Sequence, residues 1–141
     1  MDINFFSEDI DFKLKNKTKI RNWIRETIKN ENRIPGTINI IFTSDEYLLN
    51  INNQFLSHNY FTDIVTFNYC ENETIIGEIF ISKETVLNNS KRFFVSFEDE
   101  ILRVIIHGVL HLIGYNDHSN EEKKIMREKE NDYLDRVKNL L

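Results

Sequence analysis

The chain has 141 residues, of which 40% are hydrophobic and 29% charged, and its formal net charge is −5. This length favours one domain over 1–141, and the composition excludes a disordered or fibrous chain. The lone Cys70 excludes an intramolecular disulfide and favours a reducing compartment. The N-terminus lacks the features of a signal peptide, and no stretch approaches the ~20 apolar residues of a membrane span. We therefore expect a cytoplasmic protein that spans no membrane.

The N-terminal half of the chain alternates between helical and strand patterns. Apolar residues at helical spacing predict a helix over 18–33, which Pro35-Gly36 should stop. The β-branched run 37–43 predicts a strand. The pair Thr43-Ser44 can then cap a second helix that runs to about residue 56.

The C-terminal half begins with two strand patterns and continues with helices. The runs 63–69 and 74–82 are joined by a short polar link, which predicts a hairpin. Three helices should follow, and their start signals are Ser82 or Lys83, Ser96, and a Ser119/Glu122 capping box. The pattern predicts an α/β fold with a small mixed sheet of about four strands surrounded by helices.

The segment HGVLHLIGYNDH, residues 107–118, holds three of the four histidines. His107 and His111 are four residues apart on a predicted helix, so both rings leave the same face, as two ligands of one metal would. Gly114 should end this helix, and His118 could then supply a third ligand from beyond the turn. Three protein ligands leave one position open, which is typical of a catalytic zinc site at the end of a buried helix.

Two features of this segment weigh against simpler interpretations. The helix is apolar almost all round, so one histidine alone would be a buried core residue, but three favour a metal. Zinc proteases carry a glutamate directly after the first histidine, where this chain has Gly108. The glycine argues against a peptidase, and it leaves room either for a substrate or for a close structural neighbour.

These residues resemble a known family. The segment HGVLHLIGYNDH is similar to the histidine signature of the YbeY family of metal-dependent endoribonucleases. Three further segments resemble that family in the same order along the chain, and they are FTDIVTF (61–67), GEIFIS (77–82) and MREKE (126–130).

The resemblance implies a small α/β fold and a single-strand-specific endoribonuclease. The family is implicated in maturation of the 3′ end of small-subunit ribosomal RNA and in ribosome quality control, so ribosomal RNA and the small subunit are the implied partners. Its motif histidines bind one metal, usually zinc. On this chain they fall at His107, which is also the expected catalytic residue, His111 and His118.

Two rival functions stay open. One is a metal-dependent hydrolase of another substrate, including peptides, against which Gly108 speaks. The other is a ribosome-assembly factor whose metal is structural. Leu56 favours this second rival, because it stands where many family members have an arginine thought important for RNA cleavage. His58 is near, but as a loop residue it takes over no such role.

The third ligand has two candidates. Asp117 lies six residues past His111, the spacing of the family's final histidine, so register favours it. His118 would preserve three imidazoles and a higher net charge on zinc, which lowers the pKa of bound water more. We expect His118 on this chemical ground, with Asp117 as the alternative. Asp63 is a candidate for bracing a ligand histidine by a hydrogen bond.

A basic stripe marks the first helix. Its members are spaced by four, and they are Lys17, Arg21, Arg25, Lys29 and Arg33. Like charges at this spacing repel one another, and a polyanion would relieve the repulsion. The stripe is therefore a candidate RNA contact, with a merely solvated helix face as the alternative.

Overall fold

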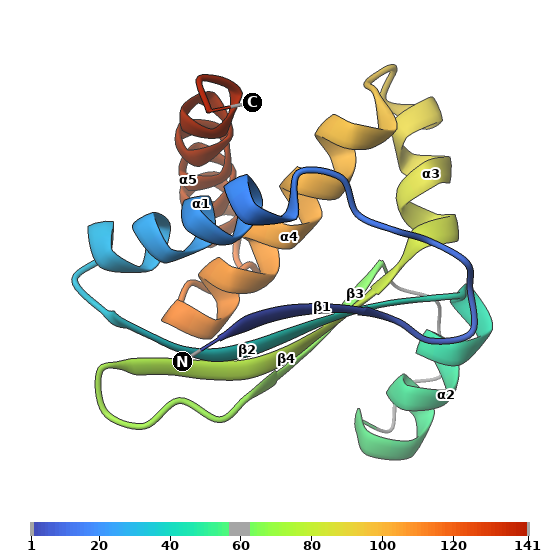
Figure 1. Ribbon diagram of the computed structural model, residues 1–141, viewed down its shortest axis with the longest axis horizontal. Coiled ribbons are helices and arrows are strands. Elements are labelled where there is room, and N and C mark those ends of the chain that lie inside the picture. Colours follow the sequence, from blue (N-terminus) through green and yellow to red (C-terminus); the bar gives the residue numbers. More distant parts are fainter. Residues whose placement is uncertain (1, 57–62, 141) are drawn as a thin grey trace.

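The computed structural model describes residues 2–56 and 63–140 and contains a four-stranded mixed sheet (Figure 1). Its strands are β1 (Ile3–Ser7), β2 (Ile34–Thr43), β3 (Ile64–Asn68) and β4 (Thr74–Ser82), in the spatial order β1-β2-β4-β3. β1, β2 and β4 are parallel, and β3 runs antiparallel to β4. The predicted fold class and the predicted β3–β4 hairpin are confirmed.

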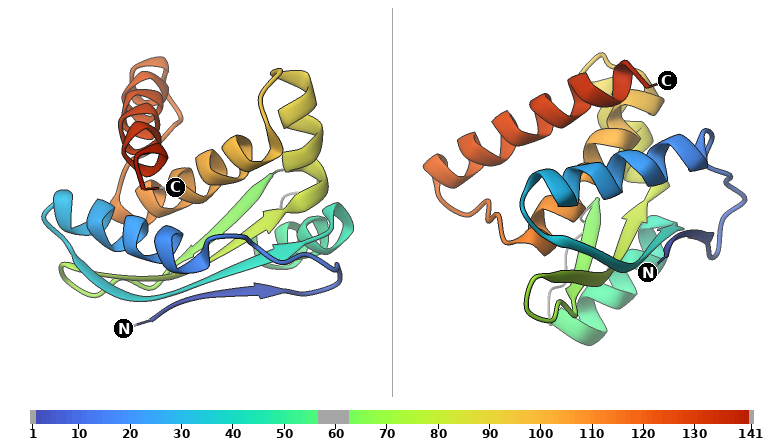
Figure 2. Two further views of the ribbon diagram at one scale, coloured as in Figure 1. Left: turned by 45° about the horizontal axis from the view of Figure 1, so that its top comes forward. Right: turned by 60° about the vertical axis from the view of Figure 1, so that its left-hand side comes forward.

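Five helices surround the sheet in the described part of the chain. They are α1 (Lys17–Asn30), α2 (Asp45–Leu56), α3 (Lys83–Arg92), α4 (Phe97–Ile113) and α5 (Asn120–Lys138). α1 and α4 cover one face of the sheet, α2 lies on the other, and α5 packs on the outside of α4 (Figure 2). In these residues no helix has both the length and the apolarity that crossing a bilayer requires.

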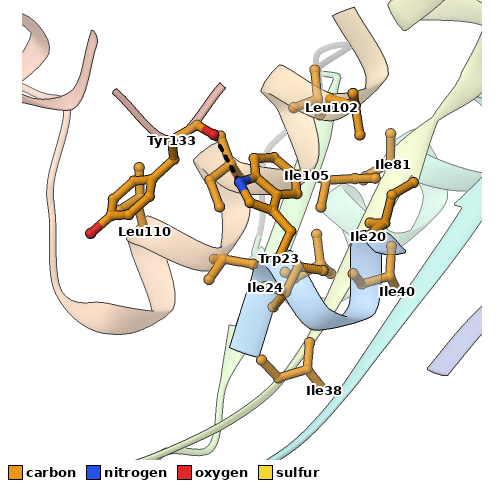
Figure 3. Close-up of a cluster of buried hydrophobic side chains, with 14 of the residues drawn as sticks. Ile20, Trp23, Ile24, Ile38, Ile40, Ile81, Leu102, Ile105, Leu110 and Tyr133 are labelled. Atoms are coloured by element: carbon orange, nitrogen blue, oxygen red, sulfur yellow. Dashed lines mark hydrogen bonds between the residues drawn. The ribbon is translucent and has the colours of Figure 1, made fainter. Parts of the chain in front are cut away.

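The main core lies between the sheet and the α1/α4 layer. Ile38 and Ile40 point from β2 into this layer, and Trp23 of α1 is 1% exposed among them (Figure 3). The Trp23 indole Nε1 donates a hydrogen bond of 2.8 Å to the carbonyl of Tyr133 on α5. This bond satisfies the buried indole, and it ties α5 to the core through α1.

Helix start signals read from the sequence are confirmed. The hydroxyls of Ser82 and Ser96 accept from the backbone N–H three residues on, and Ser119 forms a reciprocal capping box with Glu122. At α2 the Ser44 hydroxyl accepts from the backbone N–H of Tyr47. Ser44 rather than Thr43 is therefore the cap.

Two N-terminal predictions are corrected. The helix expected over 18–33 ends at Asn30, because Asn32 adopts a left-handed conformation and turns the chain into β2. Pro35 lies inside that strand, where the pairing with β4 shifts register, and so does not act as a stop signal. Strand β1 was not located from the sequence, because five residues carry little pattern and pairing with β2 defines the strand.

Candidate metal centre

Two histidines of α4 form the base of a donor group. His107 and His111 leave the same face of the helix, and their Nε2 atoms lie 3.0 Å apart. Each side chain is 22% exposed, so the ring edges are reachable from solvent although most of α4 from Glu100 onward is buried. The spacing of four residues thus produces the juxtaposition that the sequence predicted.

Asp117 completes the group from the loop after α4. The helix ends at Gly114, whose φ of 126° is costly for a residue with a Cβ, and the chain folds back. One carboxylate oxygen of Asp117, Oδ2, then lies 3.3 Å from the Nε2 atom of each histidine. These three atoms are a candidate metal-binding group.

The three donor atoms match the ligand spacing of a tetrahedral metal. Bonds of about 2.0–2.1 Å at tetrahedral angles place neighbouring ligand atoms about 3.3 Å apart. The observed separations of 3.0, 3.3 and 3.3 Å are close to that value. Two imidazoles and a carboxylate are also the donor types that zinc accepts, so the residues fit the ion.

The structure places Asp117, the alternative third ligand, beside the two histidines and does not place the expected His118 there. That residue is exposed, lies immediately before the Ser119 cap of α5, and is not part of the donor group. Asp117 stands in the register of the family's final histidine, and the loop presents its side chain to the ring edges. Register thus outweighs the chemical preference for a third imidazole, and Asp117 becomes the candidate third ligand.

Glu130 of α5 hydrogen-bonds the ring nitrogen of His107 that faces away from the donor group. Its Oε2 lies 2.6 Å from Nδ1 of His107, and its Oε1 accepts a 2.8 Å bond from Arg103. A carboxylate can only accept, so Nδ1 of His107 carries the proton and Nε2 faces the other donor atoms. Such carboxylate–histidine pairs fix the orientation of metal ligands.

Sequence reasoning missed Glu130, although a signal was present. The buried face of α5 carries Met126, Tyr133, Leu134 and Val137, and Glu130 falls on that face. It is 5% exposed. An acidic residue at a core position of an amphipathic helix is rarely buried without a partner, so its place in the pattern pointed to one.

Charge and burial set the protonation of this centre. Burial alone would lower the pKa of His107, but its hydrogen bond to Glu130 and the charge of Glu130 outweigh burial and raise that pKa. Burial alone would raise the pKa of Glu130, but the hydrogen bonds from His107 and Arg103 outweigh burial and lower that pKa. The pKa of His111 is lowered by burial and by the charge of His107. His111 thus favours the neutral imidazole that binds metals.

Asp63 interacts electrostatically with the centre. Burial raises the pKa of its carboxyl group, and its charge acts on His107. The sequence-based expectation that Asp63 braces a ligand histidine stays a prediction. Among the described residues, Glu130 is the carboxylate that bonds a ring from behind. Asp63 therefore contributes negative charge near the site.

Gly108 is explained by packing. A Cβ added there would lie 2.8 Å from Cδ1 of Ile64 and 2.9 Å from Cγ2 of Ile79, both on the sheet. Of the two interpretations left open, the close structural neighbour is the one that the structure supports. The glycine lets α4 approach β3 and β4, which brings the histidine face next to the start of β3.

We expect Gly108→Ala to destabilise the fold by about 1–3 kcal/mol, because the added methyl overpacks the sheet contact. In an exposed helix interior the same change would stabilise the fold by up to ~1 kcal/mol. The sign of the change in unfolding free energy therefore tells whether residue 108 packs against the sheet. Urea unfolding of the two proteins measures the difference. An unchanged or raised stability would show that α4 can move away from the sheet.

Glu31 anchors the loop that carries Asp117. It follows α1, its side chain is 8% exposed, and it accepts a 2.5 Å hydrogen bond from the Tyr115 hydroxyl. The Tyr133 hydroxyl also donates to it, and Lys129 lies 3.1 Å away. The network joins α1, α5 and the α4–α5 loop, and so positions the third candidate ligand.

The pKa of Glu31 predicts a pH-dependent contribution. Burial would raise this pKa, but bonds from Tyr115, Tyr133 and Lys129 outweigh burial and lower it below the usual 4.5. The network therefore stabilises the fold above about pH 4.5, and the contribution is lost as pH falls through the lowered pKa. We expect Glu31→Gln to cost about 1–3 kcal/mol at pH 7 and progressively less under acid conditions.

Thermal unfolding between pH 7 and pH 3 tests this expectation. Glu26→Gln is the matched control, because Glu26 lies on α1 with a side chain 73% exposed. The gap between wild type and Glu31→Gln should close at low pH, whereas the control should track the wild type throughout. A gap that stays constant with pH would contradict the role of the Glu31 charge.

The predicted basic stripe is largely engaged within the protein. Arg21 donates to the carbonyl of Ile3 at 2.7 Å, and Arg25 bonds Asn22. Two ion pairs follow along the stripe, Lys29 with Glu26 at 3.8 Å and Arg33 with Glu73 at 3.4 Å. Lys17 is the stripe's exposed N-terminal member. An RNA contact along the whole stripe stays a prediction.

Two predictions fall at the edge of the described residues. Leu56, at the family's arginine position, is the last residue of α2. His58 lies outside the described residues, as does Thr62 of the FTDIVTF segment.

The fold and the donor group define a small α/β protein with a candidate metal centre built on one helix and the loop after it. A family model described as Endoribonuclease YbeY matches residues 2–138. The chain belongs to that family, as the sequence resemblance predicted.

Individual relatives agree with this membership. Proteins named Endoribonuclease YbeY are 46% identical in Karelsulcia muelleri over 132 residues (94% of this chain and 93% of the relative) and 45% identical in Flavobacterium psychrophilum over 129 residues (92% of each). The solution structure of a Thermotoga maritima protein is 30% identical, with a TM-score of 0.68, and covers 96% of this chain and 88% of that one.

Proposed function

We propose that the chain is a metal-dependent endoribonuclease that cuts single-stranded RNA. We further propose that it acts in the cytoplasm on the 3′ end of small-subunit ribosomal RNA, and in ribosome quality control, with the small subunit as partner. The observation that carries the proposal is the group of three donor atoms, from His107, His111 and Asp117, in a chain whose relatives are named endoribonucleases.

The proposed cofactor is one zinc ion per chain, held by Nε2 of His107, Nε2 of His111 and a carboxylate oxygen of Asp117. When bound, such an ion lowers the pKa of a water molecule and polarises a phosphate oxygen. In this proposal the catalytic role expected for His107 is that of a ligand, because its other ring nitrogen is held by Glu130.

The protein's own residues would prepare this site in two ways. Glu130 and Arg103 keep the His107 ring in one orientation, so little rearrangement is needed when a ligand arrives. The partly exposed ring edges leave the group open to a phosphodiester from one side. Three protein donors also leave one coordination position for water or substrate.

Cleavage of a single-stranded RNA by the purified protein tests the proposal. Activity should disappear after chelation, return on adding zinc, and fall at least ~100-fold in a His111→Ala variant, which loses a ligand. Elemental analysis of the same preparations should find about one zinc per wild-type chain. Cleavage that survives both chelation and His111→Ala would overturn the proposal.

The rival functions give different outcomes in the same assay. Leu56 favours an assembly factor with a structural metal, which would bind zinc and leave RNA intact. Hydrolysis of a peptide in place of RNA would indicate the other rival, although the packing of Gly108 gives no room for the protease glutamate.

A further inference from the structure

A cluster of unpaired lysines lies away from the metal centre. The loop after β1 and the first turn of α1 present a positive charge at every second residue, and the residues are Lys13, Lys15, Lys17 and Lys19. All four are exposed. Within residues 2–56 and 63–140, no carboxylate lies within 4.0 Å of any of these four ammonium groups.

This cluster does not stabilise the fold by itself. Four like charges in seven residues repel one another. Lys17 and Lys19 also stand in the first turn of α1, where cations are disfavoured by the helix dipole and where the helix has no acidic residue. A polyanionic partner would relieve both effects and release its counterions.

Two hollows flank the same loop, and the first of them is mostly apolar. One, of about 110 Å³, lies between the loop and the N-terminal turns of α4, and its lining includes Phe12, Phe97 and Ile101 with Lys13 and Lys15. The other, of about 190 Å³, is lined by residues that include Phe5, Phe6 and Phe12 with Lys13 and Lys17. Aromatic rings and lysines therefore meet on both sides of the loop.

The aromatic rings are partly open and surrounded by positive charge. Phe6 is 49% exposed. The Arg21 guanidinium lies 5.4 Å from the ring centre of Phe5, and the Lys83 ammonium lies 5.3 Å from that of Phe12. Among the lining side chains of the two hollows, Glu98 is the acidic one. Rings for stacking beside lysines for phosphates are the combination that binds single-stranded nucleic acid.

The surface lies beside the N-terminal turns of α4, whereas the metal centre lies at the C-terminal end of that helix. Ile101 lines a hollow, and His107 follows it by six residues, so the two side chains leave α4 about 120° apart. From Phe97 to His111 the helix rises about 21 Å. RNA held here is therefore not held at the site where we propose that cleavage takes place.

We propose that Lys13, Lys15, Lys17 and Lys19, with the hollows beside Phe12, form an anchor for a single-stranded segment of the RNA substrate. This inference rests on the proposed function for the identity of the substrate. The anchor raises the affinity for long RNA and takes no part in the chemical step. It also relocates RNA binding from the mostly paired stripe of α1 to the N-terminal end of that helix.

The test measures binding of a long, protein-free, single-stranded RNA as a function of salt. Binding is measured on His111→Ala protein, so that the RNA stays intact. Adding Lys13→Ala and Lys15→Ala should weaken binding and reduce the salt slope by about 1.4, or 0.7 per phosphate contact. Lys29→Ala with Arg33→Ala removes the same charge from ion-paired residues, and should change the slope less. Equal slopes in the two double variants, or no binding by any of them, would overturn the anchor.

A stacking variant and a length comparison complete the test. Phe6→Ala removes an exposed ring without charge, so it should weaken binding roughly 5-fold or more with an unchanged slope. With otherwise wild-type protein, the lysine variant should cleave the shortest competent oligonucleotide normally and long RNA with a raised KM and unchanged kcat. Unchanged KM for long RNA would refute the anchor even if cleavage is confirmed. Binding as expected without cleavage would refute the proposed function and leave the anchor standing.

Discussion

Asp117→Ala is expected to lower the affinity for zinc by more than ~100-fold, whereas His118→Ala is expected to leave it within a few-fold. The first change removes a candidate donor atom that lies 3.3 Å from the Nε2 atoms of His107 and His111. The second removes an exposed ring outside the donor group. Changes outside the ligand set typically reduce metal affinity by 10–100-fold at most, so the loss of a ligand should exceed that range.

Competition titration against a chromophoric chelator measures both affinities. Asp117→Asn is an informative third variant, because it keeps the size of the side chain and one oxygen but removes the charge. It should fall between wild type and Asp117→Ala. If His118→Ala lost more affinity than Asp117→Ala, the loop would have to rearrange on binding metal, and the assignment to Asp117 would be wrong.

Glu130→Gln is expected to lower zinc affinity by about 10–100-fold and to reduce the stability of the fold. The glutamine can still accept from His107, but the negative charge that favours a protonated Nδ1 is gone. The Arg103 guanidinium also loses the ionic partner that lies 2.8 Å away. Breaking one member of a buried, charge-paired network is costly because the remaining charge stays partly buried.

Glu128→Gln is the matched control for this variant, since Glu128 is exposed on the same helix. Zinc titration and urea unfolding of the two variants separate a local effect on the site from a general effect of lost charge. Equal affinities in the two variants would mean that the His107 ring keeps its orientation without Glu130.

The sequence by itself determined the parts of this protein that depend on neighbours along the chain. The caps at Ser96 and Ser119 and the pairing of His107 with His111 were all predicted correctly. The reason is that helical periodicity and capping act over three or four residues. The β3–β4 hairpin belongs to the same group, because its strands are joined by a short link.

The tertiary structure decided what depends on residues far apart in sequence. Glu130 meets His107 across 23 positions, and the pattern of α5 can place Glu130 on the buried face but does not identify its partner. Strand β1 exists through its pairing with β2, and Gly108 is explained by the sheet beneath it. The position of Asp117 beside the histidines depends on how the loop after Gly114 folds back, and the Glu31 network from α1 and α5 holds Tyr115 of that loop. Spacing along the chain predicts which side chains share one face of a helix. Packing between elements decides which side chains from other helices and loops contact that face.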